Sequence, residues 1–345
     1  MKILHVTECF AGGVATAVNM YASLLPEHDH MVLYTARRAN SPATPDPDLF
    51  SRCWELPNDH RAAIATVHNV RDEVAPDVIH AHSSFAGAYA RIARMWGATC
   101  RTPVVYTPHG LAYARKDISG LHRGLFRAAE WALSWGTSVF APCGQWEGDE
   151  LHSLNRRIPS VVIPNATMPT GMTWNPTETP SVAISGRVTP QRNPELFAAI
   201  AQRVHEERPT VEFHWLGGGD AELTAHLEQS GVHVTGWLNT DELYQRLSQV
   251  NVGLHTALWD GYPMAVLEMS DIGLPVLVQD IPALHECPSQ ARFTGVDDAA
   301  QKVIRAIDAP RPLIDAWTET MEIHSVANLT EKLRECYARA QASQG

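Results

Sequence analysis

The fold can be inferred from one stretch of the chain, Ser181-Val182-Ala183-Ile184-Ser185-Gly186-Arg187-Val188-Thr189-Pro190-Gln191-Arg192-Asn193-Pro194. The apolar, partly β-branched run 181–185 predicts a strand, Gly186 ends it, and a helix is expected to begin near Pro194. Short runs of this kind alternate with longer helical patterns along the whole chain. Because parallel strands need crossover connections, usually helices, the alternation predicts parallel sheets flanked by helices.

The strand candidates fall into two sets, which predict two doubly wound α/β domains. A chain of 345 residues also exceeds the roughly 100 to 200 residues of one ordinary domain. Strands are expected in the first half at Lys2–Thr7, Met31–Thr35, Asp77–Ala81, Pro103–Thr107, Ser138–Ala141 and Val161–Ile163, and in the second at Ser181–Ser185, Val211–Leu216, Val232–Thr235, Val252–His255 and Pro275–Val278.

The domain boundaries follow from a stretch of turn-forming residues near the middle of the chain. We predict a Rossmann-like N-terminal domain over 1–168, a linker over 169–180 and a second Rossmann-like domain over 181–312. Helices over 313–345 are expected to pack back toward the N-terminal domain. The last of them is amphipathic, with apolar side chains on one side at Leu329, Leu333, Cys336 and Tyr337.

Composition excludes several classes of protein. Apolar residues make up 45% and charged residues 19%, as in packed globular proteins. The formal net charge of -11 disfavours a nucleic-acid binder. No apolar run reaches the roughly 20 residues of a membrane-spanning helix, and the N-terminus is typical of a strand, so we expect a cytoplasmic protein. The six cysteines form no CxxC pair, which predicts buried thiols without zinc or disulfides.

Two cations follow the strand that ends at Gly186. Arg187 and Arg192 flank a turn near a helix N-terminus, and guanidinium groups placed there can neutralise a departing diphosphate without a metal. For an isolated pair, a surface cation and a helix-flanking charge would be the more frequent explanation.

A second group of candidate residues lies between Asp260 and Glu268. Gly261 permits close backbone approach, and the next helix offers free N–H groups to an anion or hydroxyl. Glu268 lies about two turns into that helix and could reach a ribose. The alternatives are that Asp260 is only an N-cap and Glu268 a paired buried charge.

Taken in order, the motifs of this chain resemble those of the family 4 retaining glycosyltransferases. The matching segments are Gly12-Gly13, Asp77-Val78-Ile79-His80-Ala81-His82, Thr107-Pro108-His109-Gly110, Ile163-Pro164-Asn165, Gly186-Arg187 and Asp260 to Glu268. The resemblance implies the GT-B architecture, in which two Rossmann-like domains face each other across a cleft. It also implies a sugar transfer that retains anomeric configuration, from a UDP- or GDP-linked donor to a glycan or a lipid-linked saccharide.

The resemblance also implies roles for individual residues. Arg187 and Arg192 would hold the diphosphate, Asp260 would contact the donor sugar, Glu268 the ribose, and His109 would lie beside the transferred sugar. Further donor-binding positions are expected at Gly186, Gly217, Trp237, Leu238, Gly261, Tyr262, Pro263 and Met264. No cofactor other than the nucleotide sugar is implied. The family usually has lysine at 192 and glutamate at 260, so these two departures leave the donor sugar open.

Gly12 and Gly13 would let the backbone approach a phosphate or the acceptor. Dinucleotide binding is disfavoured because GxGxxG is absent. His80 and His82 point the same way along a strand, but without a third ligand nearby in sequence we favour structural or acceptor-lining roles over a metal site. The DxD-like Asp46-Pro47-Asp48 lies in a Pro-rich loop and is interpreted as coincidence.

Residues 111–135 mix arginine, lysine and tryptophan with leucine and phenylalanine. Such a segment could rest on the inner face of an anionic membrane, and a basic amphipathic helix that lines the cleft or is solvated explains it equally well. Two other functions stay open: a nucleotide-sugar epimerase or hydrolase of the same architecture, and a catalytically silent sugar-nucleotide-binding subunit.

Overall fold

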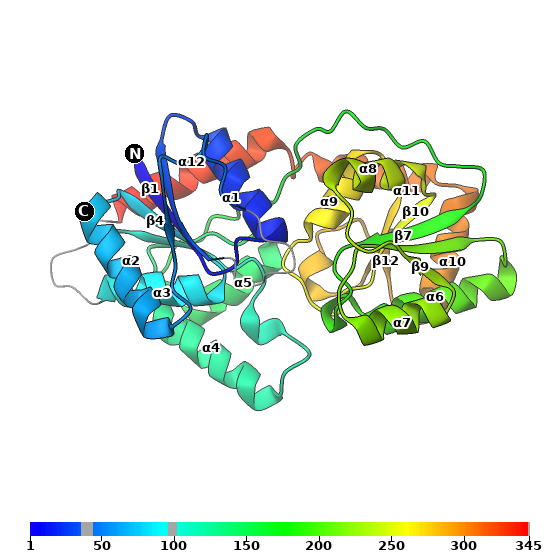
Figure 1. Cartoon of the computed structure of the whole chain (residues 1–345), viewed down its shortest axis with the longest axis horizontal. Coiled ribbons are helices and arrows are strands. Elements are labelled where there is room, and N and C mark those ends of the chain that lie inside the picture. Colours follow the sequence, from blue (N-terminus) through cyan, green and yellow to red (C-terminus); the bar gives the residue numbers. More distant parts are fainter. Residues whose placement is uncertain (36–43, 96–101, 344–345) are drawn as a thin grey trace. The chain divides into compact units, whose positions relative to one another are not determined.

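The computed structural model describes residues 1–35, 44–95 and 102–343 (Figure 1). Its contacts divide the chain into two units, one made of Met1–Asn165 with Ala327–Gly345 and the other of Ala166–Val326. The change of unit therefore falls near the predicted end of the first domain. The helices expected over 313–345 are divided between the two units.

Unit 1 contains a six-stranded parallel sheet with the strand order β3-β2-β1-β4-β5-β6. The order reverses beside β1, which lies between β2 and β4. This is a topological switch point, next to which α/β sheets bind ligands. The elements are β1 (Lys2–Thr7), α1 (Gly12–Leu24), β2 (Asp29–Tyr34), β3 (Arg52–Glu55), α2 (His60–Val74), β4 (Val78–His82), α3 (Ser84–Met95), β5 (Val104–Thr107), η1 (Ala112–Ala114), α4 (Gly120–Ser134), β6 (Val139–Phe140), α5 (Gln145–Leu154) and α12 (Val326–Ala342).

Unit 2 repeats this plan with the strand order β12-β11-β10-β7-β8-β9. Its switch point lies between β7 and β10. The elements are β7 (Ser181–Ser185), η2 (Pro190–Arg192), α6 (Pro194–Glu207), β8 (Glu212–Leu216), α7 (Ala221–Gln229), β9 (Val232–Val234), α8 (Thr240–Gln249), β10 (Val252–His255), α9 (Met264–Asp271), β11 (Val276–Gln279), η3 (Pro282–Leu284), β12 (Arg292–Phe293), α10 (Gly295–Asp308) and α11 (Arg311–Met321). Both sheets confirm the predicted doubly wound class.

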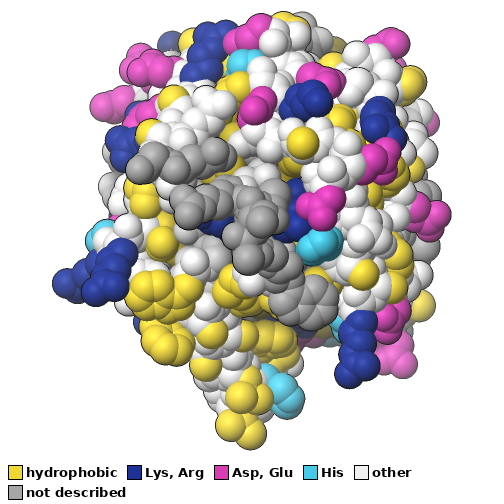
Figure 2. All heavy atoms as spheres, turned by 90° about the vertical axis from the view of Figure 1, so that its left-hand side faces the viewer, with side chains coloured by type: hydrophobic (Ala, Val, Ile, Leu, Met, Phe, Trp, Pro, Cys, Tyr) yellow, Lys and Arg dark blue, Asp and Glu magenta, His cyan; other side chains and the backbone are white. Residues whose placement is uncertain are grey.

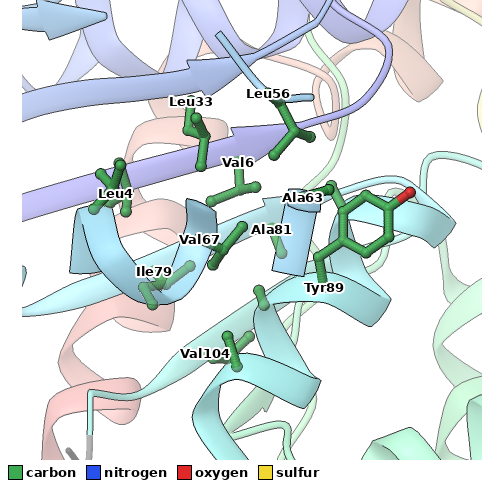
Figure 3. Packing of buried hydrophobic residues seen from close by; sticks show 14 of the residues in the cluster. Leu4, Val6, Leu33, Leu56, Ala63, Val67, Ile79, Ala81, Tyr89 and Val104 are labelled. Atoms are coloured by element: carbon green, nitrogen blue, oxygen red, sulfur yellow. The ribbon is translucent and has the colours of Figure 1, made fainter. Parts of the chain in front are cut away.

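The core of unit 1 packs one face of its sheet against α2 and α3 (Figure 3). Leu4, Val6 and Ile79 from neighbouring strands lie against Val67 of α2, and all four side chains are fully buried. Burial of an aliphatic side chain of this size contributes about 1.5 to 3 kcal/mol, so this layer fixes the strands whose ends carry the site. The predicted apolar side of the last helix is also buried at Leu329, Leu333, Cys336 and Tyr337.

Two of the predictions about local structure are wrong, and two short strands were missed. Val161–Ile163 is no strand; the N–H groups of Val161 and Ile163 donate to Phe140 and Pro142 at 2.9 and 2.8 Å, but only Ser160 forms a β-bridge. The short strands β3 and β12 were not predicted, because β3 lies at a sheet edge with mostly exposed side chains and β12 has two residues. Cys53 is exposed, whereas Cys9, Cys143, Cys287 and Cys336 are buried as expected. Cys100 and part of the Pro-rich loop lie outside the described residues.

Candidate active site

The two donor-site segments predicted in the second half of the sequence meet at one edge of the unit 2 sheet. Strands β7 and β10 are parallel neighbours, so the segments that follow them emerge side by side. Three hydrogen bonds join these segments: the Thr256 hydroxyl donates to the Arg192 carbonyl at 2.6 Å, Leu258 N–H to the Gln191 carbonyl at 2.9 Å, and the Gln191 amide to the Trp259 carbonyl at 3.0 Å. The strand order thus brings Arg192 to Asp260.

Arg192, Asp260 and His255 form a compact charged group. Arg192 Nη1 lies 3.2 Å from Asp260 Oδ2 and 3.1 Å from His255 Nδ1, and His255 Nε2 lies 3.5 Å from the same Oδ2. Burial would raise the pKa of Asp260, but Arg192 and His255 lower it below its ordinary value. Asp260 is therefore ionised at neutral pH.

The second carboxylate oxygen of Asp260 has no hydrogen-bond donor among the described residues. Oδ1 accepts from Gly261 N–H at 2.9 Å, whereas Oδ2 is buried and neighbouring nitrogens reach it at ion-pair distance without hydrogen-bond geometry. The charges of Arg192 and His255 balance that of Asp260, and Oδ2 keeps the capacity to accept a further hydrogen bond. Asp260 is also not an N-cap, because Pro263 occupies that position of α9.

Glu268 lies on α9 and forms no hydrogen bond or ion pair within the described part of the chain. Burial raises its pKa, and the positive charge of Arg192 offsets only part of the rise. Among the described residues, only the charge of Arg192 acts on this carboxylate, so the alternative of a satisfied buried charge is not favoured. The N-terminus of α9 also has no side-chain cap, so its first backbone N–H groups remain available to an anion.

Glycines bring the loops after β7 and β8 into contact. Gly217 has φ +147°, and a Cβ atom there would lie 2.2 Å from the Gly186 carbonyl oxygen. Gly186 has φ +136°, and its Cβ would meet the Arg192 guanidinium at 3.5 Å. Packing therefore requires glycine at 217, whereas at 186 the positive φ favours glycine and a Cβ would make only an ordinary contact with Arg192. Arg187, on the same loop, is exposed.

The remaining donor-site candidates differ in exposure. Trp237 is 50% exposed, and its indole nitrogen lies 3.2 Å from where a Cβ of Gly218 would be. Leu238 beside it is partly exposed. The Tyr262 side chain instead faces the interior, with its hydroxyl 3.4 Å from Cys287 Sγ. Of the next residues, Pro263 is buried and Met264 is partly exposed.

In unit 1, His109 follows β5 in a left-handed conformation, φ 51°. His109 Nε2 lies 3.1 Å from Nδ1 of His82, and His109 Nδ1 lies 3.5 Å from Cys143 Sγ. Burial lowers the pKa of His109 to about 4, so the ring is neutral at pH 7. Glu147 joins the loops after β5 and β6, since its carboxylate accepts from Gly110 and Cys143 N–H at 2.8 and 2.9 Å.

Gly12 and Gly13 form the exposed first turn of α1. Gly12 has φ +52°, and no atom lies within 4 Å of the Cβ it lacks. Ala11 precedes the helix without a side-chain cap. Backbone N–H groups are therefore exposed at this helix start, as an acceptor or phosphate would require.

His80 and His82 acquire a third histidine that sequence spacing did not reveal. In the described part of the chain, His5, His80 and His82 have ring nitrogens within 4.8 Å of one another, because β1 lies beside β4. All three side chains are fully buried and each of their nitrogens already has a hydrogen-bond partner. Of the two roles favoured over a metal site, these contacts suit the structural one, because the fully buried His82 has no exposed surface with which to line an acceptor site.

The segment 111–135 forms η1 and α4 and carries apolar side chains in the solvent. Leu121, Leu125, Trp131 and Trp135 are each more than half exposed. Figure 2 shows the side of the molecule that lies at the left in Figure 1. Hydrophobic side chains gather along its lower edge, and α4 lies low in Figure 1. The described helices include none that is long and apolar enough to cross a membrane.

Three of the residues that shape the site were not predicted. His255 ends a strand that was correctly predicted, and the end of a strand at a switch point could have marked it. Cys143 and Glu147 follow β6 and offered no motif.

Comparison with known proteins gives matches over most of the chain. Residues 12–166 match the family described as glycosyl transferase 4-like domain, and residues 179–309 match glycosyl transferases group 1. An uncharacterized protein of the cps region of Klebsiella pneumoniae is 23% identical over 93% of each chain. A UDP-Gal:alpha-D-GlcNAc-diphosphoundecaprenol alpha-1,3-galactosyltransferase of Escherichia coli is 25% identical over 67% of this chain and 66% of its own.

Among solved structures, Anabaena HepE in complex with UDP superposes with a TM-score of 0.76 at 15% identity, over 97% of this chain and 99% of that protein. At this identity the likeness concerns the fold.

Proposed function

The chain belongs to the group 1 glycosyltransferases, and from that premise we propose that it moves a hexose from a UDP-linked donor to a lipid-linked saccharide with retention of configuration. The GT-B fold and the glycosyltransferase activity predicted from the sequence are confirmed by these matches. The observation that carries the proposal is the ion pair between Arg192 and Asp260 beside the N-terminus of α9, which has no side-chain cap. Oδ2 of Asp260 accepts no hydrogen bond from the described residues.

We assign the donor diphosphate to Arg187, Arg192 and the first N–H groups of α9. When the bond to the sugar breaks, negative charge develops on the departing phosphate oxygen, and fixed positive groups stabilise it most in a site that excludes water. The ion pair with Asp260 and the hydrogen bond from the Thr256 hydroxyl to the Arg192 carbonyl hold Arg192 in position before the donor arrives. This preorganisation is what lowers the barrier.

The two carboxylates of the site have different tasks in this proposal. Asp260 Oδ2 would accept a hydrogen bond from a hydroxyl of the donor sugar, because it is buried and has no donor of its own. Glu268 would accept from the ribose hydroxyls. Trp237 offers an exposed aromatic face to the base, whereas Tyr262 would contribute only its backbone.

Retention follows from front-face attack, as the family resemblance implies. The glycosidic C–O bond to the phosphate breaks first, leaving an oxocarbenium-like sugar. The acceptor hydroxyl then bonds the anomeric carbon from the same face, and its proton passes to the departing phosphate oxygen. No carboxylate of the protein needs to form a covalent intermediate.

We assign the acceptor to unit 1, at Gly12–Gly13 and His109, and a peripheral membrane contact to α4. Exposed leucines and tryptophans next to Arg115, Lys116 and Arg123 suit an anionic membrane surface, where apolar side chains enter the interface and cations bind headgroups. The E. coli relative has a name that specifies a diphosphoundecaprenol acceptor, which supports a lipid-linked acceptor here.

The test combines binding and product analysis. In a thermal-shift panel of UDP- and GDP-sugars, a true donor at about 100 times its Kd stabilises the folded state by about 2.7 kcal/mol. The stabilising donor is then incubated with diphosphoundecaprenol-linked saccharides, and the new linkage is analysed by NMR. An elongated α-linked product from an α-linked donor supports the proposal; free sugar, an epimerised donor or an inverted linkage contradicts it.

A further inference from the structure

Three buried imidazoles and the partly exposed ring of His109 form a continuous hydrogen-bonded chain across the unit 1 sheet. His30 of β2, His5 of β1, His82 of β4 and His109 after β5 each contact the next ring, with nitrogen–nitrogen distances of 3.1, 3.0 and 3.1 Å. The chain begins at the Leu25 carbonyl, 3.0 Å from His30 Nε2, and ends at Cys143 Sγ. We call His30, His5, His82 and His109 the imidazole chain.

The direction of every hydrogen bond follows from the Leu25 carbonyl, which can only accept. His30 Nε2 must donate to it, so Nδ1 of a neutral His30 is an acceptor and takes the hydrogen of His5 Nε2. The same step repeats from His5 to His82 and from His82 to His109. His109 therefore carries its hydrogen on Nε2, and its Nδ1 accepts from the Cys143 thiol.

Neutral rings are required for this pattern. A second proton on either interior ring, His5 or His82, would set two N–H donors against each other, and both rings are buried away from solvent that could relieve the conflict. Burial lowers the pKa of all four histidines, and neighbouring imidazoles add to the shift for His5 and His82. A metal at His5, His80 and His82 would have to displace these hydrogen bonds, which are already complete.

We propose that the imidazole chain is a positioning device, which holds His109 as a neutral Nε2–H tautomer in one orientation, and that His30 at the far end sets this state. The proposal rests on the assignment of His109 to the transferred sugar. With both nitrogens engaged inside the protein, His109 offers no base to the substrate. A neutral His109 beside the transferred sugar favours the reaction, because an imidazolium would repel the positive charge that develops on the sugar.

The test is ¹⁵N NMR of the full-length protein labelled at histidine, because the shifts of the two ring nitrogens distinguish Nε2–H, Nδ1–H and imidazolium forms. At pH 7 the wild type should show His5, His30, His82 and His109 as neutral Nε2–H tautomers. In His30→Gln, the His109 signal should become a mixture of tautomers. The same variant should lower kcat by about tenfold or more with little change in donor KM, as misplacement remote from the chemistry does.

His80→Gln is the matched control. His80 is equally buried and its ring lies 4.1 Å from that of His82, but it bonds Thr107 and Tyr337 instead of the imidazole chain. Its replacement should leave the His109 tautomer unchanged. At the other end, Cys143→Ser keeps a donor to His109 and should preserve the tautomer, whereas Cys143→Ala should not.

An Nδ1–H or charged His109 in the wild type would overturn the inference, and so would an unchanged His109 signal in His30→Gln. A spectrum that changes on addition of a chelator would assign the histidines to a metal instead. None of these readings depends on sugar transfer, so the inference can fail while the proposed function stands.

Discussion

The two units share one fold but treat their buried polar groups in opposite ways. At the switch point of unit 2, Asp260 Oδ2 and Glu268 are left without hydrogen-bond donors from the described residues. At the switch point of unit 1, every nitrogen of His5, His82 and His109 has a partner. Open hydrogen-bonding positions are costly unless a ligand fills them, whereas closed ones confer rigidity.

This contrast suggests a division of labour within one chain. Unit 2 carries charge and unfilled acceptors, which suit a charged donor that arrives and leaves in each cycle. Unit 1 holds a neutral ring in a fixed position with no free nitrogen. The predictions below test this contrast, beginning with the largest expected effect.

Removing the central cation of unit 2 should have the largest effect. Arg192→Ala takes away a cation from the departing diphosphate and leaves Asp260 buried without its ion-pair partner. We expect kcat to fall by about 10² to 10³-fold, as for the loss of a donor to a developing oxyanion. Steady-state transfer assays measure it. Arg208→Ala removes an exposed arginine paired with Asp308 in the same unit and should leave kcat unchanged; equal rates for the two variants would remove Arg192 from the site.

Arg187→Ala should have the next largest effect and reduce turnover by about 10²-fold. Arg187 is exposed and lies on the same loop as Arg192, so in our proposal its guanidinium contacts the phosphates when the donor binds. Burst and steady-state kinetics with the identified donor separate transfer from product release. A variant with the full transfer rate would contradict this role.

The exposed apolar surface of α4 should affect membrane binding rather than chemistry. In Trp131→Ala/Trp135→Ala, partition onto vesicles of phosphatidylcholine with phosphatidylglycerol should fall by about tenfold, because two interfacial aromatic rings are lost. Sedimentation of vesicles measures the bound fraction, and Ile323→Ala, exposed in unit 2, is the control. Equal partition of the three proteins, or none by the wild type, would leave α4 as a solvated helix.

Replacing Glu268 should have the smallest effect, and whether the replacement raises or lowers stability tests the contrast between the two units. Burial raises the pKa of Glu268 above its ordinary value of 4.5, so the folded carboxyl keeps its proton where the unfolded one loses it. Stability contributed by this group is therefore present at low pH and is lost as pH rises from about 4.5 through the raised pKa. Glu268→Gln should stabilise the ligand-free protein by about 1 kcal/mol at pH 7 and weaken donor binding.

Urea denaturation at pH 4 and pH 7, with and without donor, measures this pair of effects. The gain should shrink at pH 4, where the wild-type carboxyl is protonated. A Glu268→Gln protein that is less stable at pH 7 would mean that a partner already satisfies the carboxylate, and unit 2 would then resemble unit 1.

Most of the secondary structure could be predicted from the sequence, because buried parallel strands are short apolar runs with clear turn signals at their ends. The edge strand β3 could not, since an exposed Arg-Cys-Trp-Glu run has no alternation to detect. The charged residues Arg192, Asp260 and Glu268 were also found, because each follows a predicted strand or lies on the helix after it. Their proposed roles stay predictions.

By itself the sequence determined most of the strands and helices and the residues at their ends, because periodicity and turn chemistry are local properties. The tertiary structure alone decided which of those ends meet. It placed Arg192 against Asp260 through the pairing of β7 with β10, and His5 beside His82 through the pairing of β1 with β4. Strand order depends on packing between segments far apart in the chain, so no local pattern could reveal four histidines as one hydrogen-bonded chain.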